Sequence, residues 1–350
     1  MRHLYKVEIF SRDYQYKDMA LSSELEIQMD YLTLENTTIH LPRVAASKGD
    51  FVHVTDFAGR VVYQGIIMDT ANQDDKSSLK VAPLLSLLDV QVEYSHVIFS
   101  RYPLERNIEQ IIQNTYINNK DTLQNIEGLE VRVLTETKET YLDIRSNIHA
   151  FWDIITKSLT LYDIAVQAEF LPQGKRILFT VGRTGESKVL EAELGNCVSQ
   201  NFVLTDNFGT LNKITFINKD SPTEKIIYYL HPNGSITQEN TDRITPVFFS
   251  AEYIQGAENF TKEAYSRAYE QMHPEKYKQC IELSYREDDK MIEPGGFKIG
   301  QKVDIYNRGQ IYPTVLTGYR QSEGLITLTF GCIRLELTKK LILARRKEIE

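Results

Sequence analysis

Long apolar runs are absent from this sequence, and their absence limits where the protein can reside. No stretch approaches the roughly 20 consecutive apolar residues that a membrane-spanning helix needs. Residues 1–9 alternate between polar and apolar side chains as a strand does, and they lack the apolar core of a signal peptide. We therefore expect a protein that has no membrane span and is made and folded in the cytoplasm.

Cysteine is scarce, and there is no excess of basic charge. The three cysteines, Cys197, Cys280 and Cys332, are far apart and lack the spacing of a disulfide framework or a zinc site. We expect each to be a small buried apolar residue. The net charge of −8 argues against stable nucleic-acid binding, because a phosphate backbone is bound by clustered lysine and arginine. DNA could still pass nearby without being held.

Catalytic and cofactor motifs are missing as well. The seven histidines are dispersed, and there is neither an HExxH zinc motif nor a Gly-x-Ser-x-Gly elbow. The carboxylates at Asp74-Asp75 and at 287–289 lack the spacing of a calcium loop and are expected in solvated loops. Residues 182–188 lack the Gly-Lys-Ser/Thr end of a phosphate-binding loop and are expected to connect two strands. We therefore expect no cofactor, no metal ion and no enzyme activity.

Two similar β-hairpins are the clearest feature that the sequence does contain. Residues 49–67 alternate in polarity around a turn at 56–59, and residues 300–319 repeat their Gly-x-x-Val-x-aliphatic spacing. The second turn is predicted as a three-residue loop, Asn307-Arg308-Gly309, with Gly309 in the left-handed conformation. Two matching hairpins, each within a strand-rich region, indicate an internally duplicated architecture.

A segment with helical patterns separates the two β-rich regions. Apolar residues recur at helical spacing over 104–112 and again over 148–159, with Asn147 as the expected cap of the second helix. Strands are expected at 162–170 and 177–181, and a further helix at 259–272. We therefore predict an α+β protein that is mainly β. Its expected parts are a β domain at 1–94, an inserted α+β domain at 95–195, a second β domain with a helix at 196–335, and a basic C-terminal helix at 336–350.

The single tryptophan, Trp152, has two possible roles. It shares an apolar stripe with Ile155 and Leu159, which favours packing in the core of the inserted domain. The alternative is an exposed indole that stacks on a sugar.

Taken together, the two hairpins, the Trp152 helix with the strand after it, and the helix–strand passage at 265–285 resemble prophage tail proteins of Gram-positive hosts. Within that group the chain resembles the N-terminal hub part of siphophage tail-associated proteins and the central hub of contractile-tail baseplates. The resemblance implies two tube-type β-barrel domains in one chain, each standing in for one tail-tube subunit. It also implies that the α+β segment forms the outer or distal part of the hub. The sequence ends soon after the second expected barrel, so we expect no C-terminal peptidase, lysozyme or receptor-binding fibre.

This resemblance implies a structural protein of the virion, located at the tail tip and made in the host cytoplasm. A homotrimer would present six tube-like domains to a six-fold tube, and the hub would close the channel. The implied partners are the tail tube or the distal tail protein ring, the tape-measure protein, and tip or receptor-binding proteins. The hairpin loops are the expected contacts with the adjoining ring, through Asp56, Phe57 and Arg60 and through Asn307, Arg308 and Gln310.

Two other functions remain open from the sequence. A tail-tip cell-wall hydrolase would need a carboxylate pair in a deep cleft, and it would release sugars or peptides from purified cell walls. A carbohydrate-binding adhesin would expose aromatic side chains on the α+β segment and bind glycans as an isolated protein. The hairpins could also be unrelated, with a monomer that forms trimers only on the assembled tail.

Overall fold

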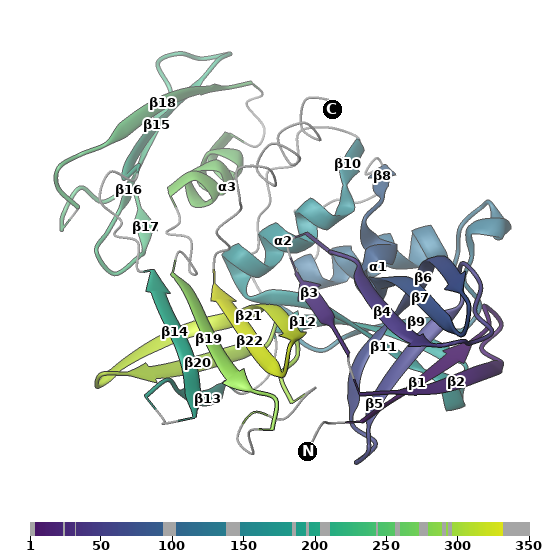
Figure 1. Ribbon diagram of the computed structural model, residues 1–350. Helices are drawn as coiled ribbons and strands as arrows, with labels where there is room; N and C mark the ends of the chain where they lie inside the picture. The colour runs from purple at the N-terminus through teal and green to yellow at the C-terminus, as the bar shows by residue number, and fades with distance from the viewer. Residues whose placement is uncertain are drawn as a thin grey trace.

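The computed structural model has a mainly β fold, and in the residues that it describes two large curled sheets are joined by smaller sheets and three α-helices (Figure 1). It describes residues 4–23, 25–31, 33–93, 103–137, 148–183, 187–193, 196–203, 211–242, 244–255, 260–272, 279–288, 292 and 296–331. The expected C-terminal helix at 336–350, the expected cap Asn147 and Cys332 lie outside these residues. The predicted class is confirmed, and each barrel-like region is a half-barrel sheet.

The first half-barrel is built from the N-terminal part of the chain. Its strands are β1 (Tyr5–Phe10), β2 (Tyr16–Ser22), β4 (Thr37–Pro42), β5 (Phe51–Asp56), β6 (Val61–Gln73) and β7 (Lys76–Pro83). They form an antiparallel sheet in the order β2-β1-β5-β6-β7-β4. The segment after β4 folds back to the far edge of the sheet, where the Ala45 N–H donates to the Asp18 carboxylate at 2.8 Å. The sheet therefore curls, because a segment next to one edge strand is hydrogen-bonded to the other.

The second half-barrel combines strands from distant parts of the chain. Its strands are β13 (Lys188–Glu191), β14 (Cys197–Val203), β19 (Cys280–Arg286), β20 (Lys302–Asn307), β21 (Gln310–Ser322) and β22 (Leu325–Gly331). They follow the order β13-β20-β21-β22-β19-β14, and β3 (Ile27–Asp30) from the N-terminal region also pairs with β21. Strand β3 thus lies within the N-terminal region in the sequence but pairs with a strand of the second sheet. This exchange links the two half-barrels through backbone hydrogen bonds.

The predicted duplication is visible in the hydrogen bonds of the two hairpins. Gly49 and Gly300 both have positive φ, at 88° and 82°, and their N–H groups donate to Ile67 and Leu316 at 2.7 Å. Strands β6 and β21 have 13 residues each, and each has a register shift where it meets the next strand. The sheet order β5-β6-β7-β4 also corresponds to β20-β21-β22-β19. A left-handed glycine before the hairpin is thus part of the repeated unit, since a residue with a Cβ rarely adopts this φ.

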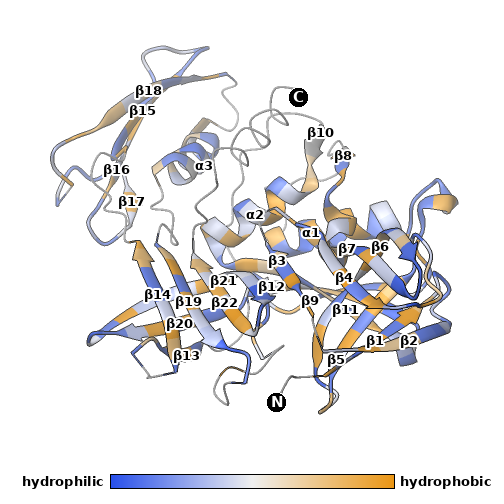
Figure 2. Cartoon of the chain, in the orientation of Figure 1, coloured by the Kyte–Doolittle hydropathy of each residue, from blue (hydrophilic) through white to orange (hydrophobic). Residues whose placement is uncertain are grey.

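The two half-barrels share one apolar core. Buried residues alternate with more exposed ones along the strands, so one face of each sheet is directed inward. Figure 2 shows the apolar and polar residues that the strands carry. The shared core includes fully buried residues from both sheets, among them Val7, Val52, Val81, Val303, Leu328 and Phe330. Neither sheet therefore buries its apolar face independently of the other.

A buried polar network also joins the two sheets. The Tyr5 hydroxyl donates to the Glu287 carboxylate, and the Gln321 amide donates to Tyr5 at 2.7 Å and to Glu287 at 3.0 Å. Tyr319 in turn donates to Gln321 at 2.8 Å. Burial, reinforced by Glu287, raises the pKa of Tyr5, so the hydroxyl stays protonated and donates. The prediction of a solvated loop is therefore wrong for Glu287, which is half-buried and satisfies two donors.

The inserted segment packs two helices against a three-stranded sheet. Its helices are α1 (Leu104–Tyr116) and α2 (Phe151–Tyr162), and its sheet has the order β11-β12-β9 with β11 (Ile164–Leu171), β12 (Arg176–Arg183) and β9 (Leu129–Val133). Short strands β8 (Gln91–Glu93) and β10 (Ile148–Ala150) pair beside it, and single 3-10 turns occupy Leu84–Leu88, Thr122–Gln124 and Pro172–Gly174. The prediction of a helix from residue 148 is wrong at its start. Residues 148–150 are extended because β10 pairs with β8, so the helix begins at Phe151.

The part of the chain that connects β14 to β19 forms a smaller body. Strands β15 (Lys213–Asn218), β16 (Lys225–Leu230), β17 (Ile236–Thr237) and β18 (Phe249–Ile254) form a sheet in the order β17-β16-β15-β18, and α3 (Phe260–Met272) covers one face. The predicted helix at 259–272 is confirmed over Phe260–Met272, and Asn259 lies outside the described residues. This body has its own core, which includes Phe216, Ile254 and Ala264. It contacts the inserted segment where Tyr269 of α3 stacks on Tyr162 of α2, with ring centroids 5.4 Å apart.

Trp152 lies in the core, as its apolar stripe predicts. Its side chain is 4% exposed, its Nε1–H donates to the Tyr31 carbonyl at 3.0 Å, and its ring lies 5.1 Å from that of Tyr31. The sugar-platform role is therefore wrong. Tyr31 follows β3, so this contact joins the inserted segment to the exchanged strand.

Replacing Trp152 should destabilise the whole protein. We expect Trp152→Ala to lower the free energy of unfolding by about 3–5 kcal/mol, because a large buried ring leaves a cavity. Leu123→Ala in the same segment is the matched control, since Leu123 is 94% exposed and its truncation should cost at most about 0.5 kcal/mol. Urea unfolding of both variants measures the difference, and equal losses would contradict the core assignment.

Candidate interaction surfaces

The first hairpin tip presents an exposed aromatic ring on a firmly held loop. The Asp56 carboxylate accepts the Arg60 backbone N–H at 2.9 Å and the Arg60 Nε at 2.7 Å, and the same guanidinium forms an ion pair with it. Asp56 is buried, whereas Phe57 is 72% exposed. Of the three predicted contact residues on this tip, Phe57 is thus the one that projects, and the other two fix the loop.

The second hairpin tip is tighter than the sequence predicts. Asn307 pairs with Gln310, so the loop consists of Arg308 and Gly309 alone, both with positive φ at 50° and 73°. This is a type I′ turn, whose twist matches that of the flanking strands. The predicted left-handed Gly309 is confirmed, but the predicted three-residue loop is wrong. Arg308 and Gln310 are exposed, and the Gln310 side chain accepts the Tyr312 hydroxyl at 2.6 Å.

The two tips occupy equivalent positions in the duplicated unit but lie apart in the molecule. In Figure 1 the β5–β6 loop lies at the lower edge near the N-terminus, and the β20–β21 loop lies at the left edge. The structure therefore does not assemble these residues into one site, and their role as contacts with an adjoining ring stays a prediction.

The inserted segment is fixed to the first half-barrel by an aromatic cluster. The ring of Phe170, near the end of β11, stacks on Phe51 at 4.9 Å and on Tyr14 at 5.9 Å, and it meets the edges of Phe10 and His53. Aromatic pairs at such distances contribute beyond their buried area. The pattern of alternating residues could not indicate this cluster, because Phe170 is more than 100 residues from the other members in the sequence.

The Gln64 side chain forms hydrogen bonds with the Phe170 backbone beside that cluster. Its Oε1 accepts the Phe170 N–H at 2.9 Å, and its Nε2 donates to the Phe170 carbonyl at 2.6 Å. The same amide lies 2.8 Å from His53 Nδ1. Because an amide nitrogen only donates, His53 Nδ1 accepts, which requires the neutral imidazole. Burial lowers the pKa of His53, although the Glu8 carboxylate opposes this effect.

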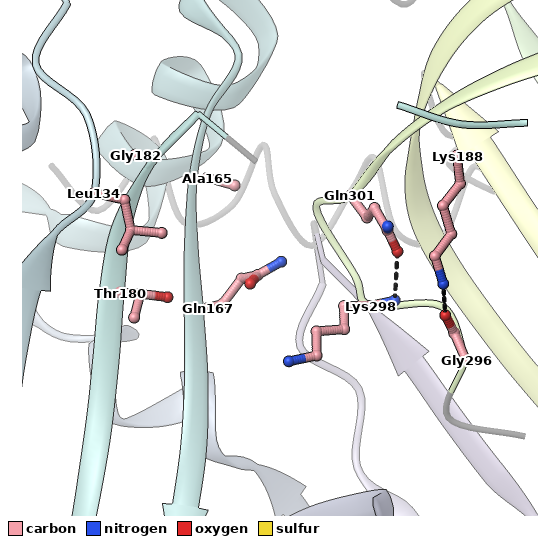
Figure 3. Close-up of a pocket in the computed structure, with 9 residues that line it drawn as sticks. All are labelled: Leu134, Ala165, Gln167, Thr180, Gly182, Lys188, Gly296, Lys298 and Gln301. Carbon is pink, nitrogen blue, oxygen red and sulfur yellow. Dashed lines mark hydrogen bonds between the residues drawn. The ribbon is translucent and has the colours of Figure 1, made fainter. Parts of the chain in front are cut away.

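A pocket separates the inserted sheet from the loop before β20. Figure 3 shows Gln167 and Thr180 on one wall and Lys298 with Gln301 on the other. The pocket has a volume of about 310 Å³. The Gln167 amide reaches across to the Ile299 carbonyl at 3.2 Å. At the rim of the pocket, the Lys188 ammonium group donates to the Gly296 carbonyl and lies 4.8 Å from the Phe297 ring centroid.

A larger groove of about 400 Å³ shares Gln167, Thr180 and Lys298 with this pocket and continues along β11. We call it the β11 groove. Its other walls come from β3, β6, the turn at Leu84–Leu88 and the loop before β20, with Met29, Leu34, Val62, Leu84, Leu85, Leu178, Phe297 and Ile299 as its main apolar residues.

The small body presents a second surface, on the sheet face opposite α3. Phe249 and Tyr253 of β18 are 75% and 65% exposed. The Lys213 ammonium lies 6.0 Å from the ring centroids of both Phe249 and Tyr229. In the described parts of the inserted segment, by contrast, no aromatic side chain is among the exposed large apolar residues.

The cysteines and acidic residues that were considered as possible metal sites form no such site in the described residues. Cys280 is buried as predicted, whereas Cys197 is only half-buried and donates to the Ser199 carbonyl. Asp74 lies in the tight turn between β6 and β7, with φ of 52°. Across the described ranges no group of three or more His, Cys, Asp or Glu side chains could hold a metal ion. No described helix combines the length and the apolarity that crossing a membrane takes.

Comparison with solved structures identifies the fold. The chain is similar to a tail protein from Neisseria meningitidis MC58, with a TM-score of 0.54 and 12% identity over 94% of this chain and 96% of that one. It is also similar to the 43 kDa tail protein of prophage MuSo2 from Shewanella oneidensis, with a TM-score of 0.54 and 13% identity over 93% and 98% of the two chains. The prophage tail protein gp18 from Listeria monocytogenes EGD-e gives a TM-score of 0.50 and 12% identity over 97% and 98%.

These likenesses cover nearly the whole of each chain, and at such identities they show the fold alone. The chain therefore has a fold found in phage and prophage tail proteins, as its resemblance predicted. No protein-family profile matches the sequence, and no curated protein sequence matches it. Since the three similar structures come from different bacteria, the fold does not identify the host, and a Gram-positive host stays a prediction.

The His53–Gln64 contact predicts a pH-dependent stability. His53 is neutral in the folded protein, and protonation would set an imidazolium N–H against the Gln64 amide. An unfolded histidine has a pKa of about 6.5. Below that pH the unfolded chain binds a proton that the folded chain does not, so stability should fall from about pH 6.5 towards the lower folded pKa.

This loss should be smaller in His53→Gln, which cannot be protonated. Urea midpoints at about pH 7.5 and about pH 5.5, compared between the variant and the unsubstituted protein, measure the contribution. His40→Gln, at an exposed histidine of β4, is the matched control. If His53→Gln loses as much stability on acidification as the unsubstituted protein, the neutral-imidazole assignment is wrong.

Proposed function

We propose that this chain is the structural hub at the distal tip of a phage tail or tail-like particle. There it would close the channel and adapt the six-fold tail tube to a three-fold tip. The observation that carries the proposal is the repeated half-barrel unit, with its matched glycines and hydrogen bonds, within a fold found in tail proteins. Two copies of one unit per chain would let three chains present six equivalent surfaces.

The link between the two half-barrels supports this role. Strand β3 pairs with β21, the sheets share one core, and the Tyr5–Gln321 contact crosses between them. Each chain would therefore hold its two tube-like units at a fixed spacing, which a symmetry adaptor requires. We propose 1–94 and 196–335 as these two units, with β3 and β13 added to the sheet of the second one. The rest of 95–195 would form the outer part of the hub, and 336–350 a C-terminal helix.

The proposed role is mechanical and not enzymatic. The hub would hold the tip shut and later open a passage for the genome or the tape-measure protein. Its other partners would be a second and third copy of itself, the tail tube or distal tail ring, and tip or receptor-binding proteins. The net charge of −8 would help DNA to pass by like-charge repulsion.

The copy number in assembled tails tests the proposal directly. We expect three copies at the tip, because two tube-like units in each of three chains match a six-fold ring. Cryo-electron microscopy of purified tails measures this number. A monomer in isolation is compatible with the proposal, since neighbouring proteins can drive assembly. Two, four or six copies in the assembled tail would overturn it.

The hairpin tips supply a second test. We expect Phe57→Asp and Arg308→Glu to leave the thermal unfolding midpoint nearly unchanged, because both side chains are exposed. Each should lower incorporation into particles by about tenfold or more if the tips meet the next ring. Leu123→Asp, at an exposed position of the inserted segment, is the control. Incorporation that drops equally in all three variants, or in none, would remove the tips from the interface.

A further inference from the structure

One edge of the inserted sheet is left open beside the β11 groove. In the order β11-β12-β9, strand β11 has a strand neighbour on one side only. On its other side the Val166 N–H donates to the Tyr31 hydroxyl at 3.0 Å, and the Gln64 side chain binds both the N–H and the carbonyl of Phe170. Two side chains thus cover the two ends of this edge.

The same bonds define which backbone groups face the groove. Successive residues of a strand direct their N–H and carbonyl groups to opposite sides. Since Val166 and Phe170 direct theirs away from β12, Ala168 does so as well. The hydrogen bonds on the other side of β12 lead to the same assignment. The Ile177 N–H donates to the Gly128 carbonyl at 3.0 Å, and the Val181 carbonyl accepts the Leu134 N–H at 2.8 Å, so the odd-numbered residues of β12 face β9. The even-numbered residues of β12 therefore face β11, where they lie opposite the odd-numbered residues of β11, such as Gln167.

Between the Tyr31 and Gln64 contacts, three backbone groups of β11 consequently have neither a strand partner nor a side-chain partner in the described structure. They are the Val166 carbonyl and the N–H and carbonyl of Ala168, which lie between the Tyr31 and Gln64 contacts. Ala168 is half-buried and lines the β11 groove. Buried backbone groups without partners cost free energy, and an open strand edge is a template for another strand.

The walls of the groove suit an extended peptide better than a small polar ligand. A peptide that adds a strand to this edge has N–H and carbonyl groups on residues two apart. Such groups could donate to the Val166 carbonyl and accept the Ala168 N–H. The apolar walls, which include Leu178, Leu84 and Phe297, would take side chains on alternate positions of such a peptide. A volume of about 400 Å³ lies within the range of known ligand pockets.

Lys298 adds a charge preference. Its side chain extends from the loop before β20 into the space that faces Gln167 and Thr180 (Figure 3). Among the described residues Lys298 forms no ion pair, unlike Lys302 of the adjacent strand, which pairs with Asp163 at 3.3 Å. A carboxylate on the bound segment would therefore complement the ammonium group.

We propose that the β11 groove binds an extended peptide segment of another protein, which carries a carboxylate side chain and adds a short strand to the edge of β11 at Ala168. The bonds from Tyr31 and Gln64 limit the added strand to a few residues, so specificity comes from the apolar walls and from Lys298. This inference stands on the sheet edge and the groove, and it does not depend on the proposed role as a hub.

The probe for this site is a library of acetylated and amidated pentapeptides. Each has a central glutamate flanked by Val, Ile, Leu or Thr, and fluorescence anisotropy with the full chain measures binding. Hydrogen exchange of the Ala168 amide, followed by NMR, reports whether the peptide pairs with the edge. N-acetylglutamate amide serves as the small carboxylate for comparison.

Two variants and one control make the test specific. Ala168→Pro removes the edge N–H while leaving the pairing with β12 intact, because proline is tolerated where a strand N–H faces outward. Lys298→Glu reverses the charge on an exposed loop. We expect each to weaken peptide binding by about tenfold or more. Lys80→Glu, at an exposed position of β7 away from the groove, should leave binding unchanged.

The expected result is a library peptide that binds, slows exchange of the Ala168 amide and loses affinity in both variants. The proposal is overturned if no library member binds at millimolar concentration, or if binding is the same in Lys298→Glu as in Lys80→Glu. It is also overturned if N-acetylglutamate amide binds as tightly as the peptides, since the site would then bind a carboxylate only. If Ala168→Pro fails to fold in a thermal melt, Lys298→Glu and the Ala168 exchange decide.

Discussion

The shared core of the two half-barrels is the constraint on which the rest of the structure depends. Each sheet curls but leaves one apolar face that it cannot cover by itself, and the two faces meet in a single buried cluster. Strand β3 crosses from the first half-barrel to pair with β21, so the union is fixed by backbone hydrogen bonds as well as by apolar contact. The two copies of the unit therefore form one joined pair instead of two separate barrels.

The inserted segment is built onto that pair through a few strong contacts. Phe170 enters an aromatic cluster on the first sheet, Gln64 pairs with its backbone, and Trp152 packs against Tyr31. Because these contacts hold β11 at both ends and leave its middle open, they also create the β11 groove. The same interactions that attach the segment therefore leave three backbone groups available to a partner.

Local patterns allowed much of the fold to be predicted. The hairpins around Gly49 and Gly300, the apolar stripes of α1 and α2, and the buried place of Trp152 all follow from residue spacing and turn chemistry. One error was local, since the loop before Gln310 has two residues instead of three, and two others occurred where distant segments decide local structure. Pairing with β8 delays the start of α2, and contact with Tyr5 buries Glu287 in a network instead of a solvated loop.

The sequence by itself determined the alternating strands, the glycines that must take positive φ, and the repetition of one unit, because each depends on residues close together in the chain. Only the tertiary structure decided which strands share a sheet, where Phe170 and Gln64 attach the inserted segment, and which edge of β11 stays open. Those features depend on register and on contacts between residues more than 100 positions apart, and no local pattern encodes them.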